Sequence, residues 1–185
     1  MLSIRTAEVG DAPAIAAIGE VAFHAVHDAV IGREAAASIV QQTYSIDALV
    51  ACITFCADAD DAHFLVAEDG ERVVGYLHYD CEGPQPELHR IYVDPARKRA
   101  GIGSALLREL NARLEPGSTY VLLVAEQNTA ARAFYERQGF VFRAKVIGQE
   151  YYAAAMGIEA DPAPEGYDDS ALVLGFTVLD GPAAA

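Results

Sequence analysis

The spacing of apolar residues at the start of the chain predicts a strand followed by a helix. Leu2 and Ile4 alternate with polar neighbours, as in a short strand with one buried face. Ile15 and Ile18 then recur at helical spacing after Asp11, a residue type that favours the start of a helix. The chain is therefore expected to open with one strand and one helix.

The segment that follows predicts two more helices and then antiparallel strands. The predicted elements are two helices within residues 33–56 and strands over residues 64–68, 72–81 and 87–93. Ser45 can cap the second of these helices, and Asp69-Gly70 is the signal for a two-residue hairpin. The two prolines within residues 82–86 end a strand, because proline cannot donate a ladder hydrogen bond.

Beyond residue 93 the pattern changes to alternating helices and strands. The predicted elements are helices over residues 104–114 and 128–138 and strands over residues 119–125, 140–147 and 170–179. Asn128 can cap its helix, and Gly139 follows the helix end, where left-handed backbone is favoured. A polar loop over residues 161–169 separates the last two strands. We predict one α/β domain over residues 1–180, with helices on both faces of a mixed sheet, and a flexible tail over residues 181–185.

Composition narrows the class of protein. A chain of 185 residues that is 52% apolar can bury one good core. No apolar run approaches the ~20 residues of a membrane span. The N-terminus lacks the basic start and following apolar run of a secretory signal. The net charge of -14 repels phosphate backbones and anionic lipids. We therefore expect a soluble cytoplasmic protein that binds neither nucleic acid nor membrane.

The cysteines do not predict a disulfide framework or a metal site. Cys52, Cys56 and Cys81 are few and irregularly spaced, which suits packing as small apolar groups in a reducing compartment. Cys52 and Cys56, with His63 nearby, could be read as metal ligands, but the second half of a zinc site is missing. We expect no metal.

Residues 88–107 carry the most informative chemistry of the chain. An apolar strand runs into a basic loop, the loop into Gly101-Ile102-Gly103, and the glycines into a helix. Without Cβ atoms at the glycines the backbone can approach an anion closely, and the first helical turn offers unpaired N–H groups. Arg97, Lys98 and Arg99 add positive charge to an acidic protein. The pattern predicts a cradle for a diphosphate.

Two other nucleotide sites fit this stretch less well. A dinucleotide-binding loop needs a third glycine where Leu106 stands, although Glu126 lies near the distance expected of a ribose-binding acid. A dinucleotide site also opens its fold, whereas about 85 residues precede this one. A nucleoside triphosphate loop needs Gly-Lys-Ser or Gly-Lys-Thr, which is absent. A solvated basic turn with helix-capping glycines stays open as an alternative.

Two motifs resemble those of the GNAT acetyltransferase family. Tyr92-Val93-Asp94-Pro95 with residues 98–103 is similar to the family's Q/R-x-x-G-x-G/A cofactor motif, with Lys98 in the Gln or Arg position and Ala100 where many members have a basic residue. Residues 128–140 resemble its N-x-x-A-x-x-x-Y-x-x-x-G-F signature at every marked position. The resemblance implies a mixed, mostly antiparallel sheet of about seven strands, splayed between the fourth and fifth.

The resemblance also implies a site for acetyl-CoA as acyl donor. The residues it assigns to cofactor binding are Ile91, Tyr92, Val93, Lys98, Arg99, Ala100, Gly101, Ile102, Gly103, Ser104, Asn128, Ala131 and Tyr135. The backbone of Ile91 and Val93 would bind the pantetheine arm and residues 98–104 the diphosphate. An amine would attack the thioester directly in a ternary complex.

Attack by an amine needs a base, an oxyanion donor and an acid for the thiolate. We assign Glu87 as the base, with His89 and Glu126 as alternatives, because a strand glutamate at this place serves some family members. The N–H of Ile91 is the candidate oxyanion donor and Tyr135 the candidate acid. Tyr135 as a core residue and Glu87 as a solvated loop end are the structural alternatives.

The acceptor is less well defined. His24 and His27, with Phe23, Tyr44 and Tyr79, lie in segments where the family builds its acceptor pocket. A small molecule or a peptide amine would suit the reaction, and a homodimer would fit the family. A non-catalytic sensor that binds acyl-CoA would keep the cradle and is the alternative function.

Overall fold

The computed structural model describes residues 1–82, 85–148 and 170–179. Along the chain the elements are β1 (Leu2–Thr6), the 3-10 turn η1 (Val9–Asp11), α1 (Ala12–Ile31), α2 (Arg33–Thr43), α3 (Ile46–Asp58), β2 (His63–Asp69), β3 (Arg72–Asp80), β4 (Glu87–Val93), the 3-10 turn η2 (Pro95–Arg97), α4 (Ile102–Arg113), β5 (Thr119–Ala125), α5 (Thr129–Arg137), β6 (Val141–Ile147) and β7 (Ser170–Thr177). The predicted loop over residues 161–169 and tail over residues 181–185 lie outside the described residues.

The strands are hydrogen-bonded in the order β1-β2-β3-β4-β5-β7-β6. The pairs β1–β2, β2–β3, β5–β7 and β6–β7 are antiparallel. In contrast, β4 pairs with β5 in parallel, with Glu87 opposite Val121. The predicted class is confirmed: a mixed, mostly antiparallel sheet of seven strands, flanked by helices and splayed between the fourth and fifth.

The chain divides into two compact units. The first comprises Met1–Asp80 with His89–Arg113, and the second comprises residues 81–88 with the residues from Leu114 onward. Because β4 passes from one unit into the other after Leu88, the predicted cofactor-binding and catalytic residues are distributed over both.

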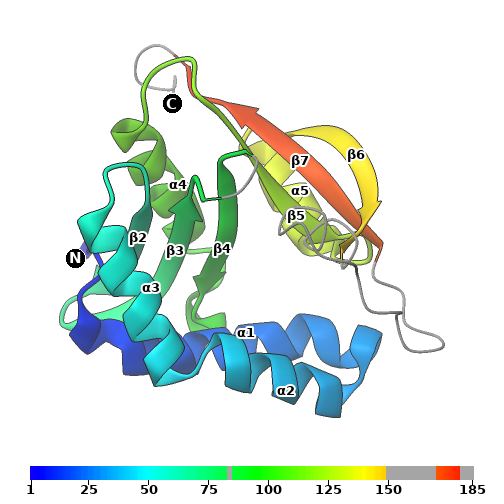
Figure 1. Ribbon diagram of the computed structural model, residues 1–185, viewed down its shortest axis with the longest axis horizontal. Coiled ribbons are helices and arrows are strands. Elements are labelled where there is room, and N and C mark those ends of the chain that lie inside the picture. Colours follow the sequence, from blue (N-terminus) through cyan, green and yellow to red (C-terminus); the bar gives the residue numbers. More distant parts are fainter. Residues whose placement is uncertain (83–84, 149–169, 180–185) are drawn as a thin grey trace. The chain divides into compact units, whose positions relative to one another are not determined.

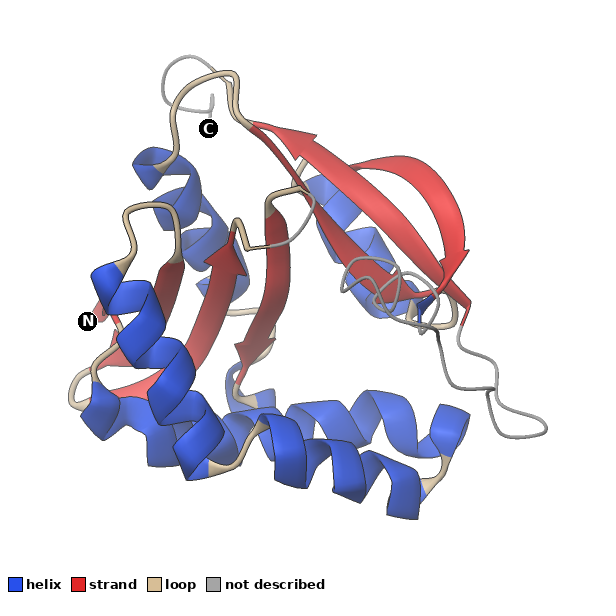
Figure 2. Cartoon of the chain, in the orientation of Figure 1, coloured by secondary structure: helices blue, strands red, loops and turns tan. Residues whose placement is uncertain are grey.

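In the first unit, helices cover both faces of the strands (Figures 1 and 2). Phe64 and Val66 of β2 belong to a core cluster with residues of α1 and α3. Leu65 and Ala67 are also fully buried although they point to the opposite face, because successive side chains of a strand alternate. Burial on both faces explains why residues 64–67 form a continuous apolar run.

In the second unit, aromatic rings pack beside the pair of β5 and β7. Tyr120 of β5 lies 5.6 Å, between ring centroids, from both Phe140 and Phe176. Tyr135 of α5 joins this cluster through Phe140, with centroids 5.3 Å apart. The cluster fixes the C-terminal part of α5 on its strands.

Three local predictions are confirmed by their caps. Ser45 accepts a hydrogen bond from the N–H of Ala48, and Asn128 accepts one from the N–H of Ala131. Gly139 has φ +93°, the left-handed conformation expected just beyond a helix.

Two local predictions are wrong by one or two residues. The hairpin turn is Gly70-Glu71 and not Asp69-Gly70, because Asp69 still pairs with Arg72. Helix α4 begins at Ile102, so Gly103 lies inside its first turn and not in the preceding loop.

The expectation that no apolar stretch is long enough to span a membrane also needs correction. Residues Val9–Ala29, which include most of α1, have the length and hydropathy of a span. Ile15 and Ile18 of this helix are buried in the core cluster. One such helix is weak support for a membrane span, because a core helix meets the same criteria.

Candidate functional site

The junction between β4 and α4 is held by close packing at Gly75 of β3. A Cβ atom at Gly75 would lie 3.0 Å from the carbonyl oxygen of Tyr92 and 3.1 Å from Cγ2 of Ile102. Only glycine fits this position without displacing a neighbour. Asp94 then turns the chain, since its side chain accepts from the N–H of Ala96 and pairs with Arg72 at 2.7 Å.

The loop that follows has a special backbone conformation. Arg99 has φ 66° and Gly101 has φ 77°, both in the left-handed region. A Cβ atom at Gly101 would meet nothing within 4 Å, so the space beside this glycine is open. Left-handed backbone at a residue other than glycine costs energy and often marks a functional site.

The N-terminus of α4 offers free donors to this open space. The N–H of Ala105 donates to the carbonyl of Gly101 at 2.9 Å and forms the first helical bond. The N–H groups of residues 102–104 precede that bond and have no helical carbonyl to bind. They also lie at the positive end of the helix dipole, which favours an anion.

The three basic residues before the glycines do not have equal roles. Arg97 pairs with Asp69 of the neighbouring hairpin at 2.8 Å. Lys98 and Arg99 are exposed, and no carboxylate in the described residues pairs with either side chain. Two cations are therefore available beside the open loop, and the arrangement fits a ligand with a diphosphate.

In the second unit, α5 holds the remaining predicted cofactor residues. Asn128 and Ala131 are tied together by the capping hydrogen bond at 3.1 Å. Tyr135 packs between Phe134 and Phe140, and burial raises its pKa above the ordinary value. The Tyr135 hydroxyl is thus protonated at neutral pH, as a proton donor must be.

The predicted base and its first alternative lie two positions apart on β4. The Glu87 side chain is buried, which is unusual for a carboxylate and excludes the interpretation of a solvated loop end. His89 contacts Asp80 of β3, with Nε2 3.0 Å from Oδ1. Glu87 is therefore buried, whereas His89 is half-buried and contacts Asp80.

Asp80 belongs to a histidine cluster that the sequence analysis missed. His78 contacts the second oxygen of Asp80 at 3.3 Å, and its ring stacks on His89 with centroids 5.0 Å apart. Burial lowers the pKa of His78, and the contact with Asp80 only partly opposes this effect. Polar residues at alternate positions of an otherwise apolar strand, His78 and Asp80, were the available signal.

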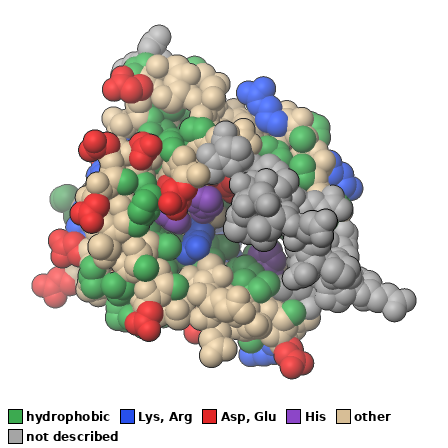
Figure 3. Space-filling view, in the orientation of Figure 1, with side chains coloured by type: hydrophobic (Ala, Val, Ile, Leu, Met, Phe, Trp, Pro, Cys, Tyr) green, Lys and Arg blue, Asp and Glu red, His purple; other side chains and the backbone are tan. Residues whose placement is uncertain are grey.

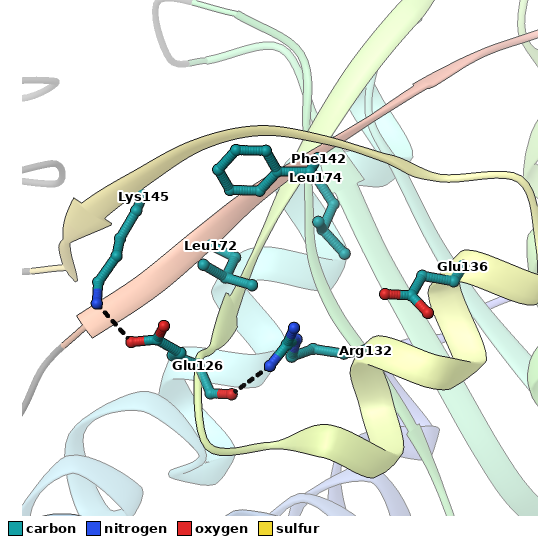
Figure 4. Close-up of a pocket in the computed structure, with 7 residues that line it drawn as sticks. All are labelled: Glu126, Arg132, Glu136, Phe142, Lys145, Leu172 and Leu174. Carbon is teal, nitrogen blue, oxygen red and sulfur yellow. Dashed lines mark hydrogen bonds and ion pairs between the residues drawn. The ribbon is translucent and has the colours of Figure 1, made fainter.

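The other alternative base, Glu126, lies in a pocket of the second unit (Figure 4). Its carboxylate pairs with Lys145 at 2.7 Å, and its carbonyl accepts a hydrogen bond from Arg132. The pocket has a volume of about 290 Å³ and is lined by Glu126, Arg132, Glu136, Phe142, Lys145, Leu172 and Leu174. The Glu126 carboxylate is therefore engaged by a lysine of strand β6.

The residues predicted to shape the acceptor pocket are only partly brought together. Phe23 stacks on His27 with ring centroids 4.1 Å apart and contacts Tyr44 at 5.9 Å. His24 pairs with Asp28 at 2.6 Å. Tyr79 stacks on His63, with ring centroids 6.0 Å apart.

The cysteines of α3 pack in the core. Cys56 is buried in the core cluster and Cys52 packs against it. Among the described residues no group of three or more His, Cys, Asp or Glu side chains could hold a metal ion.

Comparison with known proteins points to one family. Residues 60–142 match the family model described as acetyltransferase (GNAT) domain. The N-alpha-acetyltransferase RimI of Mycobacterium tuberculosis is 42% identical over 82 residues, which cover 42% of this chain and 51% of that protein. A mycothiol acetyltransferase of Clavibacter sepedonicus is 39% identical over 84 residues, which cover 44% of this chain and 28% of that protein. The chain thus spans about half, or less, of the length of these curated relatives.

Solved structures share the fold over nearly the whole chain. The PaiA N-acetyltransferase of Thermoplasma acidophilum in complex with coenzyme A superposes with a TM-score of 0.74 at 20% identity, covering 96% of this chain and 99% of that chain. The structure of yncA from Salmonella typhimurium with its cofactor acetyl-CoA superposes with a TM-score of 0.68 at 20% identity, covering 100% and 98%.

Proposed function

We propose that the chain is a GNAT acetyltransferase, because residues 60–142 match the model of that family, and that it transfers the acetyl group of acetyl-CoA to a primary amine. The observation that carries the proposal is the open loop at Gly101 with its free N–H groups and cations, which lies inside the matched segment. The relative named as an N-alpha-acetyltransferase supports an amine as acceptor. We propose a small molecule or a peptide amine.

In this proposal the first unit binds the donor. Lys98, Arg99 and the N–H groups of residues 101–104 hold the diphosphate, and the backbone of Ile91 and Val93 binds the pantetheine arm. Asn128, the N-cap of α5, and Ala131 complete the proposed binding residues. Acetyl-CoA supplies an activated thioester carbonyl, which the amine attacks.

The proton transfers are assigned to two side chains. Glu87 takes the proton that the amine loses on forming the C–N bond. The N–H of Ile91 stabilises the oxyanion, and Tyr135 donates to the thiolate when the C–S bond breaks. Burial raises the pKa of Tyr135, so the hydroxyl is protonated at neutral pH and can donate a hydrogen bond to the thiolate.

The cradle can be tested with two matched glycines. Gly101 and Gly70 both have positive φ, and neither has an atom within 4 Å of its would-be Cβ. Alanine at either position should cost about 1 kcal/mol of backbone strain. Acetyl-CoA at 100 times its Kd should stabilise the wild type and Gly70→Ala by about 2.7 kcal/mol in thermal unfolding, and Gly101→Ala far less.

Equal acetyl-CoA shifts in the two variants would contradict the cradle. Turnover is measured as free thiol released with a panel of amines. Binding of acetyl-CoA without acetylation of any amine would favour the sensor over the enzyme. A cytoplasmic location and a homodimer belong to the proposal and are checked by cell fractionation and by light scattering.

A further inference from the structure

Arg90 of β4 is a half-buried cation, and no described carboxylate forms an ion pair with it. Its guanidinium lies over the ring of Tyr44, with Cζ 5.1 Å from the centroid, and its Nη1 is buried without a hydrogen-bond partner. The protein has 27 acidic and 13 basic residues, so carboxylates are abundant. A buried donor without an acceptor is costly, and such groups are rare.

Asp80 of the adjacent strand β3 is a carboxylate that is already engaged by histidines. Both oxygens of Asp80 contact imidazoles, at 3.0 Å from His89 and 3.3 Å from His78. Burial is the largest effect on the pKa of His78 and lowers it. The charge of Arg90 acts in the same direction with a smaller effect. Figure 3 shows basic and histidine side chains together near the centre of the face it draws.

A second buried donor lies close to Arg90. The Tyr76 hydroxyl is buried and makes no hydrogen bond of good geometry, although Tyr44 is its polar neighbour. Burial raises the pKa of Tyr76, whereas the charge of Arg90 opposes the rise. Gly19 of α1 makes room for this hydroxyl, since a Cβ there would lie 2.7 Å from it. Two donors in one place therefore lack an acceptor.

We infer that Arg90 binds a carboxylate carried by the acceptor amine, an inference that rests on the proposed acetyl transfer. A guanidinium offers planar, paired donors that match a carboxylate, and the ring of Tyr44 packs against this one. Arg90 is adjacent in sequence to Ile91, whose N–H is assigned to the thioester carbonyl. Successive Cα atoms are about 3.8 Å apart, so an amine a few bonds from the carboxylate can reach the thioester. The acceptor is an amino acid or a similar amino carboxylate.

The test compares each of the twenty amino acids with its carboxamide as acceptor for the full chain and acetyl-CoA. Wild type should prefer at least one acid over its amide by about 10- to 100-fold in kcat/KM, mainly through KM. Arg90→Gln should lose this preference, and Arg90→Lys, which keeps the charge without the paired donors, should retain part of it. Arg33→Gln, an exposed arginine of α2, is the control and should behave as wild type.

The outcomes separate the two proposals. Equal rates for acids and amides in the wild type, or an unchanged preference in Arg90→Gln and Arg90→Lys, would overturn the role of Arg90 and leave acetyl transfer intact. The same holds if acetyl-CoA stabilises the protein but only amines without a carboxylate are acetylated. Absence of both acetyl-CoA stabilisation and acetylation would overturn the proposed function itself.

Discussion

The substitution Tyr135→Phe removes one hydroxyl from α5 and leaves the ring in place. The ring packs against Phe134 and Phe140, with centroids 5.2 and 5.3 Å away. No described residue is hydrogen-bonded to the Tyr135 hydroxyl. The hydroxyl is also not one of the buried polar atoms without a partner, so its removal breaks no buried hydrogen bond. Phenylalanine keeps the packing, so we expect the free energy of unfolding to change by less than about 0.5 kcal/mol.

The expected loss of turnover follows from the hydrogen bond that the Tyr135 hydroxyl would donate to the thiolate. A hydrogen bond to a charged group contributes about 1.5 to 3 kcal/mol, and about 1.4 kcal/mol is tenfold in rate, so turnover should fall by roughly 10- to 150-fold. Burial raises the pKa of Tyr135, so the hydroxyl stays protonated below ~10. The loss should therefore be the same at pH 7 and pH 9.

The assay measures free thiol at saturating acetyl-CoA and, in parallel, thermal unfolding of the two proteins. Acetyl-CoA affinity should stay close to wild type, because the substitution retains the ring of Tyr135. Full activity with reduced stability in Tyr135→Phe would refute the acid role. Tyr135 would then be a structural member of the aromatic cluster, and water would serve the thiolate.

Two other changes test the base and the N-terminal ion pairs. Glu87→Gln should lower turnover by ~10²- to 10⁴-fold at neutral pH, and less at high pH where more acceptor is neutral; wild-type rates would move the role to His89. Burial alone would raise the pKa of Asp11, but hydrogen bonds from Arg5 and the N–H of Glu8 outweigh it and lower the pKa. The pair of Arg5 and Asp11 therefore stabilises the fold above the unfolded pKa of ~3.9, and this stabilisation is lost as the pH falls through the folded pKa. In Arg5→Met the free energy of unfolding should depend less on pH in this acid range.

The parts of the fold that depend on local signals could be predicted from the sequence. Ser45, Asn128 and Gly139 act through neighbouring backbone groups, so their roles are visible in a few residues of sequence. The predicted hairpin turn differs by one residue from the observed turn at Gly70-Glu71. The register of a strand pair is set by packing across the sheet as well as by the turn.

The side-chain partners within the site could not be predicted in the same way. Arg97 was grouped with Lys98 and Arg99 as a ligand for phosphate, yet Asp69 of the hairpin pairs with it. The structure also shows that Asp80 of β3 contacts His89 of β4 and that Arg90 of β4 packs on Tyr44. Such contacts join residues distant in sequence, and a linear pattern does not specify which side chains meet.

Two energetically unfavourable features, one on β4 and one in the loop that follows it, support the binding of a ligand along this part of the chain. Exposed cations such as Lys98 are solvated by water, so their lack of a carboxylate costs little. Arg99 differs because its backbone is left-handed, and Arg90 differs because its Nη1 is buried without an acceptor. These two positions flank Ile91 and Val93, where the thioester arm is proposed to bind. Binding of the diphosphate would offset the backbone strain at Arg99. Binding of the acceptor carboxylate would offset the desolvation of Arg90.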